Sequence, residues 1–319
     1  MQMERMNHLF IEPEIEMDKQ VRKPASYVRK TFSVKKELKK AEIVLSACGL
    51  YKAYINGHEI DSQVFLPGFT DYHYRLQYQK YDVTGQLCIG KNAIAAVIGD
   101  GWYRGRIGLL DCQDYYGDKI KFLCVLRLSY VDGETECIVT DESWKATQNG
   151  PIRKNDLKSG EAYDAPMEME GWQEAEFDDS SWHGVLKSSY EGTLMPTVGE
   201  RILEHEEFNP KVFTTPDGST LLDFGQNLNG YVKFKVNGEK GHTVAMIHGE
   251  TLDENGNFTL KNLQLEGGSA GKREITEAFG QVIRYTLKEG EQEYKPLFMS
   301  AGFQYVKLFD WPEPILPEN

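Results

Sequence analysis

Residues 66–105 read LPGFTDYHYRLQYQKYDVTGQLCIGKNAIAAVIGDGWYRG, and this stretch decides the fold class. It alternates strand-like runs with glycine-rich turns, which is typical of a β-sandwich. The aromatic residues in it are Phe69, Tyr72, Tyr74, Tyr78, Tyr81, Trp102 and Tyr103. Aromatic faces beside carboxylates and amides suit the binding of carbohydrate rings. Aromatics at a spacing of two residues are equally typical of packing inside a sheet, so both interpretations stay open.

Length and charge restrict the class of protein. A chain of 319 residues is longer than one core usually spans, so we expect two domains. The net charge of −13 argues against nucleic acid or an anionic membrane as a partner, because both would be repelled. No apolar run approaches the roughly 18 residues of a membrane span, and residues 1–19 show no export signal. We therefore expect a cytoplasmic protein, of open oligomeric state.

The cysteines and histidines indicate no metal site. The cysteines are odd in number, which favours reduced thiols; they are Cys48, Cys88, Cys112, Cys124 and Cys137. No Cys-x-x-Cys pair is present and the seven histidines are scattered, so we predict neither zinc nor a cofactor.

The rest of the chain reads almost entirely as strands. Asn56-Gly57, Asp132-Gly133 and Asn237-Gly238 stand between strand-like runs and predict hairpin turns. The charged segment KKELKKAE, residues 35–42, lacks an apolar stripe and is interpreted as a loop. We predict an all-β protein of two consecutive antiparallel β-sandwiches.

Proline and glycine mark the domain boundaries. Residues 187–202 are rich in Ser, Gly and Pro, which places a boundary near residue 196. Residues 311–319 contain three prolines and are typical of a linker. The predicted division is therefore a first sandwich at 1–195, a second at 196–310 and a linker at 311–319.

The first candidate site joins the two ends of the opening stretch. Glycines in GDGWYRG, residues 99–105, allow a compact turn that presents Trp102 outward. The alternative is that Trp102 plugs one end of the sandwich. Trp102, Asp71, Tyr72, Asp100 and Tyr103 form a candidate sugar-binding or domain-contact site. A structural calcium ion in this site is the alternative to the absence of a cofactor.

Two further groups contain chemically capable residues. Glu161, Tyr163 and Asp164 lie close together and are further sugar-binding or domain-contact candidates. With Asp178-Asp179, which follow, they also raise the hypothesis of paired carboxylates for glycosidic cleavage. Solvated loop carboxylates, and a side-chain-capped turn at Asp178-Asp179, are the favoured interpretation. Gln226 and Asn227 can bind a sugar or a neighbouring domain, or simply form a turn. No catalytic residue is predicted.

Several stretches together resemble one family, the bacterial α-L-rhamnosidases of glycoside hydrolase family 78. PGFTDYHYRLQYQKYDVTGQL, GDGWYRG, SGEAYDAPMEMEGW and FDDSSW resemble its N-terminal β-domain. LLDFGQNLNGYVKF, HGETL and AGFQYVKL resemble the second β-sandwich that follows it. The motifs keep the order of the family from about Tyr27 to Leu308. The chain departs from the pattern at Pro166, where the family usually has arginine.

The resemblance implies a galactose-binding-like jelly roll, then a second sandwich, both upstream of an α/α barrel that carries the catalytic carboxylates. We expect this chain to be a non-catalytic N-terminal region whose partners are a rhamnose-containing glycan or the enzyme's own barrel. The alternative is a stand-alone carbohydrate-binding protein.

Overall fold

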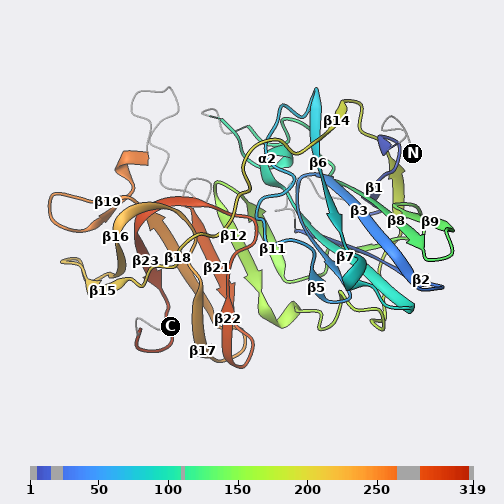
Figure 1. Cartoon of the computed structure of the whole chain (residues 1–319). Helices are drawn as coiled ribbons and strands as arrows, with labels where there is room; N and C mark the ends of the chain where they lie inside the picture. The colour runs from blue at the N-terminus through green and yellow to red at the C-terminus, as the bar shows by residue number, and fades with distance from the viewer. Residues whose placement is uncertain (1–5, 16–23, 109–111, 264–280, 316–319) are drawn as a thin grey trace. The chain divides into compact units, whose positions relative to one another are not determined.

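The computed structural model describes residues 6–15, 24–108, 112–263 and 281–315, and nearly all regular structure in them is β (Figure 1). The chain forms two compact units. Unit 1 comprises Met1–Gly150 and Met169–Glu204, and unit 2 comprises Pro151–Glu168 and His205–Asn319. No helix in the described ranges is long and apolar enough to cross a membrane. All five cysteines are free, as predicted.

Unit 1 is a sandwich of two sheets. The larger sheet has the order β13 (Val185–Ser188), β1 (Phe10–Pro13), β8 (Lys121–Tyr130), β3 (Leu38–Cys48), β6 (Arg75–Asp82) and β14 (Thr193–Pro196), with β9 (Thr135–Val139) beside β8. The smaller sheet has the order β10 (Lys145–Thr147), β2 (Ser26–Val34), β7 (Gly90–Gly99), β4 (Leu50–Ile55) and β5 (His58–Glu59). The short helices η1 (Thr84–Gln86) and α2 (Gly101–Arg104) lie in connections. Apolar side chains such as Ile43, Phe122 and Trp144 fill the core.

Unit 2 is built on a second large sheet. Its order is β11 (Ile152–Asp156), β12 (Gly160–Asp164), β21 (Val282–Thr286), β18 (Thr243–Gly249), β23 (Ala301–Phe309), β16 (Thr220–Gly230) and β15 (Lys211–Thr214). A separate two-stranded antiparallel sheet of β17 (Phe234–Gly238) and β22 (Gly290–Tyr294) contributes Phe234, Val236 and Tyr294 to the core. The strands β19 (Thr251–Leu252) and β20 (Phe258–Thr259) and the short helices η2 (Ala165–Met167) and η3 (Lys261–Leu263) complete the unit.

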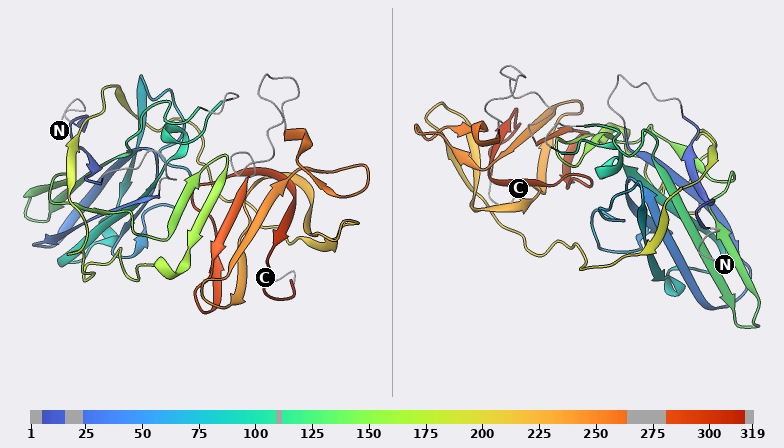
Figure 2. Two further views of the ribbon diagram at one scale, coloured as in Figure 1. Left: turned by 180° about the vertical axis from the view of Figure 1, so that it is seen from behind. Right: turned by 90° about the horizontal axis from the view of Figure 1, so that it is seen from above.

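The boundary between the units differs from the one drawn from the sequence. Residues 151–168, placed in the first sandwich from sequence, belong to unit 2, because β12 pairs in parallel with β21 (Figure 2). Gly160 permits this approach, since a Cβ at that position would overlap the backbone of Val282. A pairing between segments more than 100 residues apart leaves no mark in the local pattern. Residues 316–319 of the predicted linker lie outside the described residues.

Of the predicted turns, two join paired strands and one does not. Asn56 and Gly57, with φ of 49° and 83°, connect β4 to β5, and Asp132-Gly133 connects β8 to β9. Asn237-Gly238 instead ends β17, which pairs with β22 and not with the next strand along the chain. The prediction of a hairpin there was wrong, because an Asn-Gly pair does not determine which strand its neighbour meets.

The charged segment of residues 35–42 also differs from its prediction. The sequence predicts a loop, whereas β3 begins at Leu38 and pairs with β8 along its length. Lys39 and Lys40 are exposed, so this end of the strand projects into water and shows no apolar alternation. Hydrogen bonding to β8 therefore makes this segment a strand, although its side-chain pattern does not predict one.

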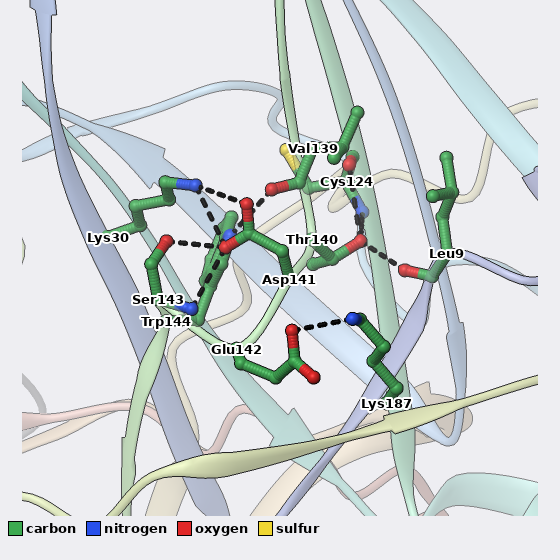
Figure 3. A network of polar contacts seen from close by, with 10 residues as sticks. All are labelled: Leu9, Lys30, Cys124, Val139, Thr140, Asp141, Glu142, Ser143, Trp144 and Lys187. Atoms are coloured by element: carbon green, nitrogen blue, oxygen red, sulfur yellow. Dashed lines mark hydrogen bonds and ion pairs between the residues drawn. The ribbon is translucent and has the colours of Figure 1, made fainter.

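Two turns of the pattern Asp-x-Ser-Trp hold opposite faces of β2. In the first turn, the Trp144 amide donates to the carbonyl of Asp141 at 3.1 Å. The Asp141 carboxylate accepts from the Ser143 amide at 3.0 Å and from Lys30 Nζ, also at 3.0 Å (Figure 3). The indole of Trp144, wholly buried, donates to the carbonyl of Val139 at 2.9 Å. The turn is therefore tied to β2 by an ion pair and to the core by its tryptophan.

The second turn meets the neighbouring residue of β2, whose side chain points the other way. Arg29 is completely buried, and its guanidinium pairs with the carboxylate of Asp179. It also donates to the carbonyls of Trp172 at 3.0 Å and Glu174 at 2.7 Å. Asp178 accepts from the Ser180 amide at 3.0 Å, which confirms the predicted capped turn.

We predict that Asp179→Ala lowers the free energy of unfolding of unit 1 by about 3 kcal/mol, because it leaves a buried guanidinium without its counterion. Urea titration measures the loss. Asp178→Ala is the matched control, since it removes one turn hydrogen bond worth about 1 kcal/mol. Equal losses in the two variants would contradict the assignment of Arg29 as the anchor.

Candidate functional site

The first candidate site lies in unit 1, where the loop of residues 66–74 meets α2 and the segment that follows it. Leu66 forms a β-bridge with Tyr51, which fixes the start of the loop. The carbonyl of Asp71 accepts from the amides of Tyr74 and Arg75, each at 3.0 Å, and so closes a turn that presents residues 71–74. Backbone bonds therefore determine the course of the loop.

Two of the predicted site residues form the floor of this region. Tyr72 is 3% exposed and Tyr103 is 7% exposed, with ring centroids 5.7 Å apart. The Tyr72 hydroxyl donates to the carbonyl of Gly68 at 2.8 Å, and Tyr190 donates to the carbonyl of Tyr72, also at 2.8 Å. Burial raises the pKa of both Tyr72 and Tyr103 well above the ordinary value. Both rings therefore support the surface from below.

The turn of residues 99–105 forms the helical turn α2. Asp100 is buried, and its carboxylate accepts from Arg104 Nε at 2.7 Å. This buried pair neutralises both groups. Trp102 is half-buried and packs against Phe69, with ring centroids 5.7 Å apart. The tryptophan thus both contacts the sandwich and reaches the surface.

The exposed part of this region consists of aromatic rings together with the polar side chains of Asp71 and His73. Phe69 and Tyr115 are each 54% exposed, and Tyr115 lies 5.5 Å from the ring of His73. His73 Nδ1 is 3.5 Å from the carboxylate of exposed Asp71. We name as the aromatic surface the residues Phe69, Asp71, His73, Trp102, Tyr115 and Tyr116. Its rings can stack on sugar faces while its carboxylate accepts from hydroxyl groups.

Sequence reasoning missed the contribution of Tyr115 and Tyr116, which lie 4.8 Å apart by ring centroid. The sequence does show two adjacent tyrosines between Asp114 and Gly117 in a polar loop, a pattern that indicates exposed aromatic rings. Tyr116 reaches back to Tyr72 at 5.0 Å. The contact joins segments more than 40 residues apart, which only the fold reveals.

The described residues contain no group of three or more His, Cys, Asp or Glu side chains arranged to hold a metal ion. Asp100 is engaged by Arg104, which leaves Asp71 as the exposed carboxylate of the predicted pair. Calcium takes six to eight oxygen ligands, so this carboxylate alone does not make a calcium site. The expectation of no cofactor stays a prediction, and a structural calcium ion stays its alternative.

Glu161 lies on β12 of unit 2 and is buried, so the interpretation of it as a solvated loop carboxylate was wrong. Its carboxylate is 1% exposed and accepts from the hydroxyl of Tyr294, from the amide of Leu297 at 3.0 Å and from that of Phe298 at 2.8 Å. Burial raises its pKa, while the three donors oppose that shift. Glu161 therefore anchors β12 to residues 294–298.

The other predicted residues of unit 2 are distributed over its large sheet. Tyr163 stacks on Tyr285 with ring centroids 5.5 Å apart, and the Asp164 amide donates to the carbonyl of Pro151. Gln226 and Asn227 are exposed on β16, where its register with β23 shifts. Three strands separate β12 from β16, so the sheet does not bring these two groups together.

Two family domains match this sequence. The α-L-rhamnosidase N-terminal domain matches residues 36–206. The bacterial α-L-rhamnosidase concanavalin-like domain matches residues 213–319. The first match falls mainly on unit 1 and the second on unit 2.

Similar proteins carry the same description. An α-L-rhamnosidase from Streptomyces avermitilis is 36% identical over 281 residues, which is 87% of this chain and 26% of that protein. The crystal structure of a native α-L-rhamnosidase from Aspergillus terreus matches with a TM-score of 0.88 at 33% identity, covering 97% of this chain and 35% of that one. The crystal structure of the Streptomyces avermitilis α-L-rhamnosidase complexed with L-rhamnose matches with a TM-score of 0.84 at 34% identity, covering 92% of this chain and 28% of that one. The chain spans 26% to 30% of the length of the curated relatives it matches.

We predict that the stability difference between the wild type and Glu161→Gln shrinks as the pH rises from 4 to 7. Because the pKa of Glu161 is raised in the folded state, its stabilising contribution is present below the ordinary pKa of about 4.3 and is lost as the pH rises through the raised value. Urea titrations at several pH values measure the difference. Glu291→Gln, which changes an exposed carboxylate on β22, is the control. A difference that grows with pH would show the opposite shift.

Proposed function

Because this chain belongs to the α-L-rhamnosidase family, we propose that it is the non-catalytic N-terminal region of an α-L-rhamnosidase-like glycoside hydrolase. The observation that carries the proposal is the match of residues 36–206 and 213–319 to the family's N-terminal and concanavalin-like domains. In this proposal, a different part of the full-length enzyme hydrolyses terminal α-L-rhamnosides. The two sandwiches support that part of the enzyme or contact its substrate.

The environments of the candidate carboxylates support a non-catalytic role. Glycoside hydrolysis usually needs two carboxyl groups about 5 to 10 Å apart on either side of the scissile bond. Asp100 is bound by Arg104 and Asp179 by Arg29, while Glu161 is held by Tyr294 and two backbone amides. Each of these groups is used to hold the fold.

Contact with the remainder of such an enzyme is proposed for the irregular segment of β16. Between Asp223 and Leu228 the pairing of β16 with β23 shifts, and this bulge projects Gly225, Gln226 and Asn227 into water. The Asp223 carboxylate accepts from the Gly225 amide at 2.7 Å and from Gln304 Nε2 at 3.0 Å, which holds the bulge in shape. Bulges of this kind re-aim side chains next to functional surfaces.

We predict that the purified chain does not release nitrophenol from 4-nitrophenyl α-L-rhamnoside above the rate in buffer. A full-length member of the family, assayed in parallel, controls for substrate quality. Enzyme-dependent turnover that follows the chain through successive purification steps would contradict the non-catalytic assignment.

The aromatic surface favours a second candidate, a carbohydrate-binding protein for rhamnose-containing glycans. Phe69 and Tyr115 are the most exposed rings of the aromatic surface, and Asp71 and His73 lie on the loop that also carries Phe69. Large exposed aromatics cost solubility, so two of them in one place mark a candidate contact surface. This reading is compatible with the first, because a substrate-contacting region of an enzyme and a free-standing binder need the same surface.

We predict saturable binding of rhamnose-containing oligosaccharides by isothermal titration, weakened at least tenfold by Phe69→Ala combined with Tyr115→Ala, because stacking of each ring contributes about 1 kcal/mol. Phe208→Ala, which removes an exposed aromatic outside the surface, should leave affinity unchanged. Titration in EDTA tests the calcium requirement. Equal affinity in the double variant would show that the glycan binds outside this surface. Absence of binding by the wild type would contradict the second candidate function.

A further inference from the structure

One histidine of unit 2 is wholly enclosed and incompletely hydrogen-bonded. His248, near the end of β18, has 0% exposure, and its ring lies 4.8 Å from that of Phe303. Its Nδ1 is 2.7 Å from the carbonyl oxygen of Gln281, whereas Nε2 has no hydrogen-bond partner among the described residues. A carbonyl only accepts, so Nδ1 carries the proton and Nε2 presents a bare lone pair.

The residue held by this histidine occupies an unfavourable backbone conformation. Gln281 has a φ of 45°, which is uncommon for a residue with a side chain, and it directly precedes β21. Its carbonyl also receives the backbone amide of His248 at 3.4 Å. Ring and backbone of His248 therefore converge on one carbonyl at the start of β21. That strand lies between β12 and β18, so its first residue helps to join both neighbours.

The charged groups nearby do not compensate a charge on the ring. Lys307 of β23 pairs with Ile247, and Arg284 of β21 pairs with Ala245. Ala245 and Ile247 precede His248 by an odd number of residues, so their side chains point to the opposite face of the sheet. Paired residues share a face, so Arg284 and Lys307 also lie on the face away from His248. Glu161 of β12 pairs with Ile283 and is already engaged by Tyr294, Leu297 and Phe298. Glu250, two residues beyond His248, accepts from Asn262 Nδ2 at 2.7 Å. Among the described residues, a proton added at Nε2 would therefore create a cation without an acceptor.

We propose that His248 is an acid-sensitive latch in unit 2, which holds Gln281 and the start of β21 when neutral and releases them when a proton from solvent binds Nε2. Release exposes the ring to water, where the cation is stable. The backbone conformation of Gln281 favours the change, because the residue relaxes once its carbonyl is free.

The expected pH range follows from the environment of the ring. Burial lowers the pKa of His248 to about 4, while the bond to Gln281 opposes that shift. Because the pKa of His248 is lower in the folded state than in the opened state, protonation stabilises the opened state relative to the folded one. The latch is therefore fully effective above the ordinary pKa of about 6.5 and weakens as the pH falls from there toward 4.

Hydrogen exchange of the whole chain, read by mass spectrometry on peptides covering β21, tests the latch. Relative to His248→Asn, whose amide nitrogen can replace Nδ1 but does not titrate, the wild type should open about 20-fold more at pH 5 than at pH 7, as the two pKa values imply. Peptides of β7 in unit 1 are the internal control. Parallel behaviour of wild type and variant in β21 would overturn the proposal.

A second measurement does not depend on the variant folding. The His248 imidazole resonances of the wild type, followed by NMR, should remain unchanged as the pH falls through 6.5. A titration of the folded chain with its midpoint near 6.5 would equally overturn the proposal, because such a ring could be protonated without release.

Discussion

The arrangement of unit 1 depends on one buried charge, the guanidinium of Arg29, which is inaccessible to water. An ion in such a place is stable only with a counterion and hydrogen-bond acceptors around it. Asp179 and the carbonyls of Trp172 and Glu174 provide them, so residues 172–179 must lie against β2. The adjacent Lys30 fixes the turn at Asp141 on the other face. One strand thereby positions two segments that are more than 100 residues away.

Unit 2 uses a buried charge of the opposite sign for the same purpose. Glu161 accepts from the Tyr294 hydroxyl and from the amides of Leu297 and Phe298, and so holds β12 in a sheet whose other strands, apart from the adjacent β11, come from residues after 210. Anchors of this kind specify position more than they add stability, because desolvation offsets much of the attraction. They explain why residues 151–168 leave the first sandwich. The aromatic surface and the Arg29 anchor both belong to unit 1.

Local chemistry made much of the fold predictable. Alternating side chains and the turn at Asn56-Gly57 indicated a β-sandwich correctly, and the family motifs indicated two of them. Pairing over long distances was not predictable: nothing near Gly160 reveals Val282 as its neighbour, and nothing near Asp179 reveals Arg29. The same limit applies to the candidate site. Asp71, Tyr72, Trp102 and Tyr103 do converge, but the burial of Tyr72 and Tyr103 and the arrival of Tyr115 depend on tertiary packing.

The protein is a scaffold held by buried charges, with one aromatic face of unit 1 toward solvent. Amide chemical-shift mapping with methyl α-L-rhamnoside on isotope-labelled protein tests it most directly, because it locates contact without assuming a residue. The account predicts saturable shifts concentrated in residues 66–74, 100–108 and 112–120. Shifts confined to unit 2, or none at millimolar ligand, would contradict the claim that this face of unit 1 meets the glycan.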